Sequence, residues 1–175
     1  MKHSLFMWEL AGAMIIFLLG SLIHFGYKFT GEIKLFTAIF AVNESIWEHA
    51  KLTFWAPLIF ATMEFFFIGK FYPNFITAKT FSAIITTIVM VVLFYSLIGI
   101  TGYHSLATDL LIYEISIIFG LIISYKITLM NPLPYYTNKL SIVIILLFLF
   151  IFYLFSYNPP KLPFFKCSST GKYGL

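Results

Sequence analysis

The sequence predicts an all-α membrane protein, a polytopic bundle of about five transmembrane helices. Hydrophobic residues make up 61% of the 175-residue chain and charged residues only 10%, whereas a soluble domain carries about 25% charged residues. Five apolar segments each approach the roughly 20 residues that a membrane-spanning helix needs. Lipid must therefore cover most of the surface, and we expect residues 1–175 to form a single integral membrane domain.

Turn and capping residues place the elements in order along the chain. Ser45 and Glu48 match a capping box, which predicts that the second helix begins at Ser45. Pairs of proline and asparagine follow the second, fourth and fifth apolar segments and predict their ends. The predicted helices lie at about 8–27, 45–68, 81–100, 106–130 and 140–157, followed by a polar tail at 158–175.

Three local features add to this plan. Pro57 lies inside the second helix and is expected to kink it. The apolar stretch 35–42 is too short to span, so we expect a short re-entrant or interfacial segment before the second helix. Small residues Gly12, Gly20 and Ser21 form a stripe on the first helix, which is typical of close helix packing.

The charges fit a lipid bilayer as the partner and do not fit nucleic acid. The net charge is +4, but the lysines lie singly at segment ends, as snorkelling anchors do, instead of clustering: Lys28, Lys70, Lys79, Lys126 and Lys139. Cys167 is the only cysteine, which excludes an intrachain disulfide and a cysteine-based zinc site. The sequence leaves open whether the chain forms a homo-oligomer or binds a membrane-protein partner.

Most of the histidines and several acids are predicted to meet at one membrane face. Five spans place the termini on opposite sides, so the end of the first helix and the starts of the second and fourth share a face. Side chains from three helices that converge in this way form the usual bundle site. The candidate polar site comprises His24, Glu44, Glu48, His49, Lys51, His104 and Asp109.

Each of these residues also has a purely structural interpretation. Glu44 and Glu48 suit the start of a helix, Lys51 pairs with a carboxylate there, and His24 suits a packing position. Glu64, late in the second helix and near Lys70, is expected to be an interfacial acid. In the functional interpretation, His24, His49 and His104 bind zinc or another divalent metal.

The stretch NESIWEHAKLTFW, with His24-Phe25 before it and YHSLATD and SYKI after it, resembles a family of small bacterial multi-pass membrane proteins of unknown function. The tail NPPKLPFF followed by TGKYG resembles the same family. The resemblance covers most of the chain and implies a location in the bacterial cell (inner) membrane. It implies no substrate or reaction.

Three classes of function remain open. The chain is a small transporter or channel component, a membrane accessory protein whose polar cluster holds the helices together, or an intramembrane metal-dependent enzyme of the hydrolase type. In the enzyme, Glu48 or Asp109 would handle protons. No H-E-x-x-H, G-x-S-x-G or phosphate-loop motif is present, so the sequence favours the first two classes.

Overall fold

The computed structural model describes residues 2–175, and this part of the chain is all-helical. Its long helices are α1 (Lys2–Phe29), α2 (Ile46–Phe67), α3 (Phe75–Thr101), α4 (Leu106–Thr128) and α5 (Tyr136–Tyr157). Short 3-10 turns η1 (Lys34–Ala38), η2 (Gly69–Phe71) and η3 (Pro163–Phe165) lie between or after them. All five helices are long and apolar enough to cross a membrane, which confirms the predicted all-α class with five apolar helices.

Three helices begin earlier than the apolar segments that predict them. α1 begins at Lys2, α3 at Phe75 and α5 at Tyr136, each several residues ahead of the expected start. Hydropathy marks only the part of a helix that lies in hydrocarbon, whereas backbone hydrogen bonding continues into the interface. The 28 residues of α1 span about 42 Å, which exceeds the roughly 30 Å hydrocarbon core.

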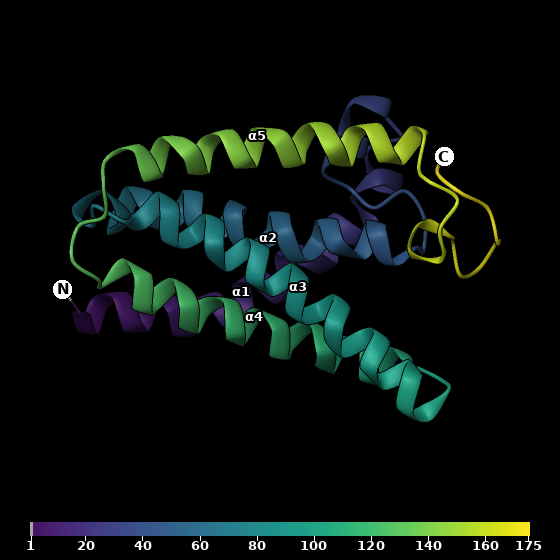
Figure 1. Cartoon of the computed structure of the whole chain (residues 1–175), viewed down its shortest axis with the longest axis horizontal. Coiled ribbons are helices and arrows are strands. Elements are labelled where there is room, and N and C mark those ends of the chain that lie inside the picture. Colours follow the sequence, from purple (N-terminus) through teal and green to yellow (C-terminus); the bar gives the residue numbers. More distant parts are fainter. Residues whose placement is uncertain (1) are drawn as a thin grey trace.

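α2 is the central helix of the bundle. In its most apolar 18-residue window 61% of residues are buried, against 28% or less in each of the other helices. α5 lies along one side of α2, and α1 and α4 lie on the other side (Figure 1). The two chain ends lie at opposite ends of the bundle (Figure 1).

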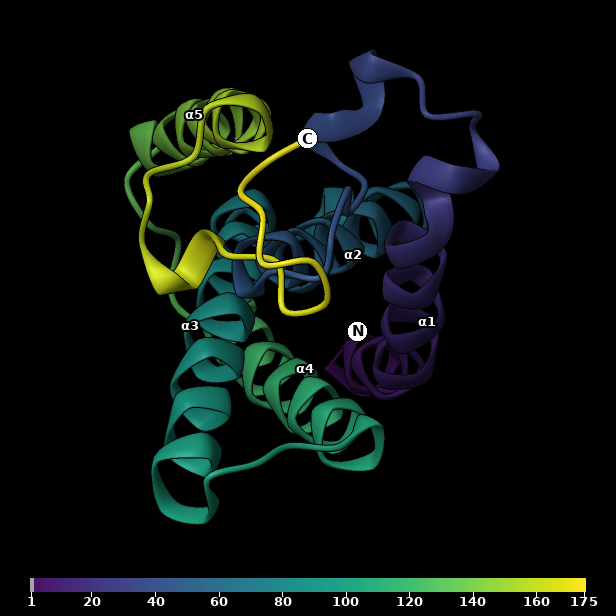
Figure 2. The same ribbon diagram turned by 90° about the vertical axis from the view of Figure 1, so that its right-hand side faces the viewer.

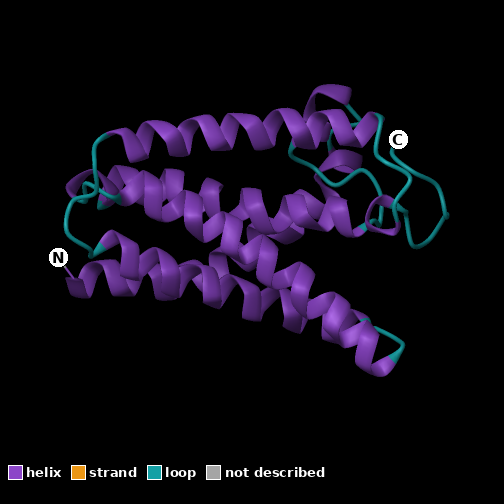
Figure 3. Ribbon diagram, viewed as in Figure 1, coloured by secondary structure: helices purple, strands orange, loops and turns teal. Residues whose placement is uncertain are grey.

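The hairpin of α3 and α4 diverges from α2 and α5 at its tip (Figures 1 and 3). Gly102 ends α3 with a left-handed backbone, at φ 76°, which only glycine adopts without strain. Ser105 and Thr108 then form a reciprocal capping box that starts α4. The hairpin tip therefore has a defined turn, and its divergence opens one end of the bundle.

Glycines allow α1 to pack closely on its neighbours, as the small-residue stripe predicts. A Cβ atom on Gly20 would overlap the Tyr113 hydroxyl of α4, and one on Gly12 would lie 2.8 Å from the Phe60 ring of α2. The Tyr113 hydroxyl donates a hydrogen bond to the Ile16 carbonyl at 3.2 Å, so the contact carries a polar link as well. Gly20 lies one turn before His24, and this contact therefore positions His24.

The predicted capping box of α2 is half correct. Ser45 is the N-cap, and its hydroxyl accepts from the Glu48 backbone N–H at 3.3 Å. The Glu48 carboxylate does not return to Ser45, because it accepts from the Val42 N–H at 3.0 Å. The Ser45 N–H donates instead to the Asn43 side chain at 2.9 Å. Glu48 therefore fastens the preceding segment to α2.

The segment before α2 and the C-terminal tail meet at the open end of the bundle. Turn η1 packs beside the end of α5, where the Tyr157 hydroxyl donates to the Lys34 carbonyl at 3.1 Å. Seen from this end, the tail crosses the start of α2 (Figure 2). The Asn43 amide donates to the Gly174 carbonyl at 3.0 Å, which ties the tail to the same segment.

Candidate functional site

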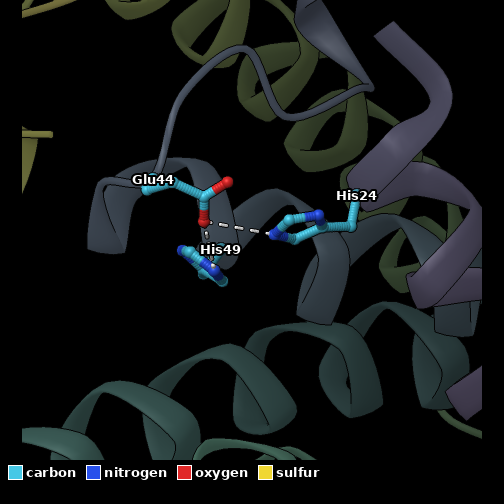
Figure 4. A group of neighbouring side chains, drawn as sticks. All are labelled: His24, Glu44 and His49. Atoms are coloured by element: carbon cyan, nitrogen blue, oxygen red, sulfur yellow. Dashed lines mark ion pairs between the residues drawn. The ribbon is translucent and has the colours of Figure 1, made fainter. Parts of the chain in front are cut away.

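His24, Glu44 and His49 form a three-residue group at the open end of the bundle (Figure 4). His24 comes from the end of α1, Glu44 from the loop before α2, and His49 from the first turn of α2. One oxygen of Glu44 lies between the two imidazole rings, whose centroids are 5.2 Å apart (Figure 4). One ligand atom from each residue lies within 4.8 Å of the other two.

The spacing of these atoms suits a shared metal ion better than direct hydrogen bonds. Glu44 Oε2 is 3.4 Å from His24 Nε2 and 3.6 Å from His49 Nε2. Hydrogen bonds between such groups are about 2.7–3.2 Å long. Ligand atoms around a tetrahedral zinc ion with bonds of about 2.0–2.1 Å are separated by roughly 3.3 Å. The two observed distances are slightly longer than the edges of such a tetrahedron, and the three residues could hold a metal ion.

A hydrogen bond to the backbone fixes the orientation of His49. Its Nδ1 lies 2.8 Å from the Ser45 carbonyl, one turn earlier, and donates a proton to it. This bond selects the tautomer whose free Nε2 faces Glu44, as in most metal-binding histidines. His24 is held differently, because its buried Nδ1 has no hydrogen-bond partner among residues 2–175 and its ring packs edge-on against Phe25.

The C-terminal tail holds the backbone of Glu44. Ser168 donates twice to the Glu44 carbonyl, from its N–H at 3.3 Å and from its hydroxyl at 3.0 Å. Burial raises the pKa of the Cys167 thiol, but hydrogen bonds from Ser169, Thr170 and the Glu44 backbone outweigh burial and lower that pKa to about 6. The thiolate that results at neutral pH favours the docked tail. The loop that carries Glu44 is thus fixed from its exposed side.

A cavity of about 680 Å³ lies against the three-residue group. Glu44, His49, Lys166 and Ser168 line it near the membrane face. The rest of the lining is mostly apolar. Phe94, Ile98 and Leu110 lie near the tip of the α3–α4 hairpin, and Leu52, Met90 and Ile112 lie farther from the open end. Met90 lies about three helical turns before the end of α3. The cavity thus joins a polar mouth to an apolar interior.

A second polar pair lines the same cavity from the α3–α4 hairpin. His104 Nδ1 lies 2.8 Å from Asp109 Oδ2, and the His104 ring packs against Phe94. The other Asp109 oxygen is buried and has no partner among residues 2–175. The sequence predicts that His104 binds a metal together with His24 and His49. In the structure, His104 lies outside that three-residue group and belongs to a separate histidine–carboxylate pair.

Glu48 and Lys51 lie away from the cavity, in a buried network under α5. Lys51 Nζ donates to Glu48 Oε2 and Ser156 Oγ at 2.5 Å each and to the Thr37 carbonyl at 2.7 Å. Both side chains are at most 1% exposed. All three donors of the ammonium are used, so this pair joins α2, α5 and η1. The structural interpretation of the sequence includes the pairing of Lys51 with a carboxylate but not these links to η1 and α5.

The sequence prediction missed a charged cluster at the opposite end of the bundle. Lys79 is buried between Glu9 and Glu64, so it is not an interfacial anchor, and Glu64 is not an interfacial acid beside Lys70. The sequence analysis does not identify Glu9 as a candidate site residue. All three residues lie within one to two turns of a helix end at the same face, and this shared depth is the signal that could have found them.

Comparison with known proteins shows one family. Residues 1–175 match a family of unknown function (DUF6512), and the chain belongs to that family. The searches of curated proteins and of solved structures each found no match.

Proposed function

We propose that this DUF6512 protein is a membrane-embedded, metal-dependent hydrolase that binds a zinc-class divalent ion through His24, Glu44 and His49. The observation that carries the proposal is the spacing of the three ligand atoms at the mouth of the cavity. Two histidines and one glutamate are a known ligand set of catalytic zinc sites, in which the fourth position holds water. The five long apolar helices support a membrane location.

The metal would lower the pKa of a bound water and polarise the substrate oxygen. Glu44 and the two histidines would hold the ion, and the Ser45 carbonyl fixes the orientation of the His49 ring. His104, held by Asp109, is the proton donor that lines the same cavity. Water would add its oxygen to the ester carbonyl carbon as the ester C–O bond breaks, and the proton that this water loses would reach the leaving oxygen through His104, which Asp109 holds.

The cavity supports an amphipathic substrate, such as a lipid with an ester bond near its polar group. Its mouth is lined by ionisable side chains and its interior by aliphatic and aromatic ones. Apolar chains would fill the interior and place the hydrolysable bond at the metal. A lipid substrate also fits a protein of the bacterial inner membrane, the location that the sequence resemblance implies.

Transport or a channel role is the second candidate, and one observation favours it. A buried charged cluster, Glu9, Glu64 and Lys79, lies at the end opposite His24, Glu44 and His49. Two polar clusters at opposite ends of one bundle suit a path for protons or cations. An accessory role has no comparable support, because a cavity of about 680 Å³ is not needed to hold helices together.

The decisive experiment measures metal bound to protein purified in mild detergent and incubated with zinc. We expect close to one ion per chain in the wild type and a loss of at least about tenfold in affinity for His49→Ala and for Glu44→Gln. His3→Ala is the matched control, because His3 is exposed and lies at the other end of α1. A wild type that stays metal-free, or variants that bind as well as the control, would contradict the proposal.

A second measurement separates hydrolysis from transport. With zinc bound, the protein is mixed with short-chain phospholipid esters and the released fatty acid is measured. We expect His104→Ala to lose about 10²-fold or more in kcat while keeping its metal, because it removes a proton donor and no ligand. Bound metal with no hydrolysis of any lipid ester would favour the transport candidate.

A further inference from the structure

The end of the bundle opposite the metal site contains a buried ionic cluster. Glu9 of α1, Glu64 of α2 and Lys79 of α3 are 5%, 0% and 4% exposed. Lys79 Nζ lies 2.8 Å from Glu9 Oε1 and 2.6 Å from Glu64 Oε2. The Ser124 hydroxyl of α4 donates to Glu9 Oε1 at 2.7 Å. Four helices therefore enclose one ammonium and two carboxyl groups.

The charges of this cluster do not balance if both carboxyl groups are ionised. One lysine offsets one carboxylate, and the cluster would keep a charge of −1 within the packed helices. Every other lysine at this end is exposed: Lys2, Lys70, Lys126 and Lys139. An unpaired buried charge is strongly unfavourable, and in proteins such a group takes up a proton instead.

The hydrogen bonds show where a proton fits. Glu9 Oε2 and both carboxylate oxygens of Glu64 are buried and have no hydrogen-bond partner among residues 2–175, although Glu64 Oε2 forms the ion pair with Lys79. The phenol of Tyr72 lies near Glu64 and near the Tyr125 phenol of α4, and neither phenol adds a positive charge. A proton on one carboxyl group would neutralise the cluster and convert an unpartnered acceptor into a donor.

We infer that Glu9, Glu64 and Lys79 form a proton-binding site that holds one proton at neutral pH, at the membrane face opposite the metal site. The site shares no residue with the metal group and does not depend on the hydrolase proposal. Release of the proton leaves one negative charge at the junction of α1, α2, α3 and α4, so the packing of these helix ends depends on its occupancy.

Infrared spectroscopy of the purified protein tests this directly. The wild type should show the C=O stretching band of a protonated carboxyl group at neutral pH, and the band should disappear as the pH is raised. Glu64→Gln and Glu9→Gln should each abolish this titrating component. Glu32→Gln is the matched control, because Glu32 is exposed in the loop after α1, and it should keep the whole signal. The spectra are recorded with and without sodium.

The result that overturns the inference is a wild type with no titrating carboxyl band at neutral pH, in either buffer. A band that survives unchanged in both glutamine variants overturns it equally. Thermal unfolding adds a readout that needs no band assignment. Because deprotonation leaves a buried charge, the Tm of the wild type should fall as the pH is raised, and that of Glu64→Gln should fall less than that of Glu32→Gln. Equal falls in the two variants would contradict the site.

Discussion

At the scale of the residue, the buried ionisable groups differ in how fully they are partnered. Lys51 uses its three donors on Glu48, Ser156 and the Thr37 carbonyl, whereas three carboxylate oxygens of Glu9 and Glu64 have no hydrogen-bond partner among residues 2–175. A fully partnered ion pair serves to hold a structure in one arrangement. An incompletely partnered one leaves room for a proton. Burial alone therefore does not distinguish a structural pair from a binding site.

Removing Lys51 should destabilise the fold strongly. Lys51→Met leaves the Glu48 carboxylate buried without its cation, which costs about 3–5 kcal/mol. Thermal unfolding in detergent should show a large fall in Tm, and the double variant Lys51→Met with Glu48→Gln should recover part of it. Lys28→Met is the control, because Lys28 is exposed at the end of α1. A Tm for Lys51→Met equal to that of the control would refute a structural role for the pair.

The docking of the tail should weaken in acid because of Cys167. Its pKa in the folded protein is about 6, below the ordinary thiol value of 9.0. The stabilisation that this difference supplies is complete above the ordinary value and is lost as the pH falls through about 6. Trypsin should therefore cut the tail at Lys166 and Lys172 faster at pH 5.5 than at pH 8, relative to Cys167→Ala at the same two values. If the ratio of the wild-type cleavage rate to the Cys167→Ala cleavage rate is the same at both pH values, the Cys167 thiolate does not stabilise the docked tail.

At the scale of the element, the contact of α1 with α4 determines where His24 lies. Gly20→Ala should push the two helices apart, because the added methyl group overlaps the Tyr113 hydroxyl. We expect a loss of about 1–3 kcal/mol in stability and weaker zinc binding, since His24 follows one turn later. Gly99→Ala is the matched control in α3, where an added Cβ meets nothing within 4 Å. Equal stability and zinc affinity in the two variants would show that the contact is not tight.

The sequence predicted elements better than it predicted partners. The lengths of the apolar segments predicted five helices, and the capping pattern predicted Ser45 as the N-cap of the second. Both predictions succeeded because each signal lies in a short stretch of sequence. The grouping of Glu44 with His24 depends on how the loop before α2 folds and on the tail bonded to it through Ser168, which no local pattern encodes. Lys79 and Lys70 look alike in sequence, and only packing against α1 and α2 separates the buried one from the exposed one.

At the scale of the whole molecule, an odd number of spans gives the protein two unlike faces. One end carries His24, Glu44 and His49 together with the cavity and the tail, and the other end carries the cluster around Lys79. α1, α2 and α4 contribute polar side chains to both ends, so a shift of one of these helices along its axis would move polar groups at both ends. Zinc binding and proton binding are expected to influence each other in equal measure if such a shift occurs.

The topology itself is the most direct test of this arrangement. The two chain ends lie at opposite ends of the bundle (Figure 1), and the five apolar helices would place them on opposite sides of a membrane. Reporter fusions that are active only in the cytoplasm or only outside it should give opposite results at the N-terminus and the C-terminus. Fusions in the loop between α2 and α3 and in the loop between α4 and α5 should agree with the N-terminal one. Matching results at the two ends would mean that one helix does not span, and then His24, His49 and His104 would not share a membrane face.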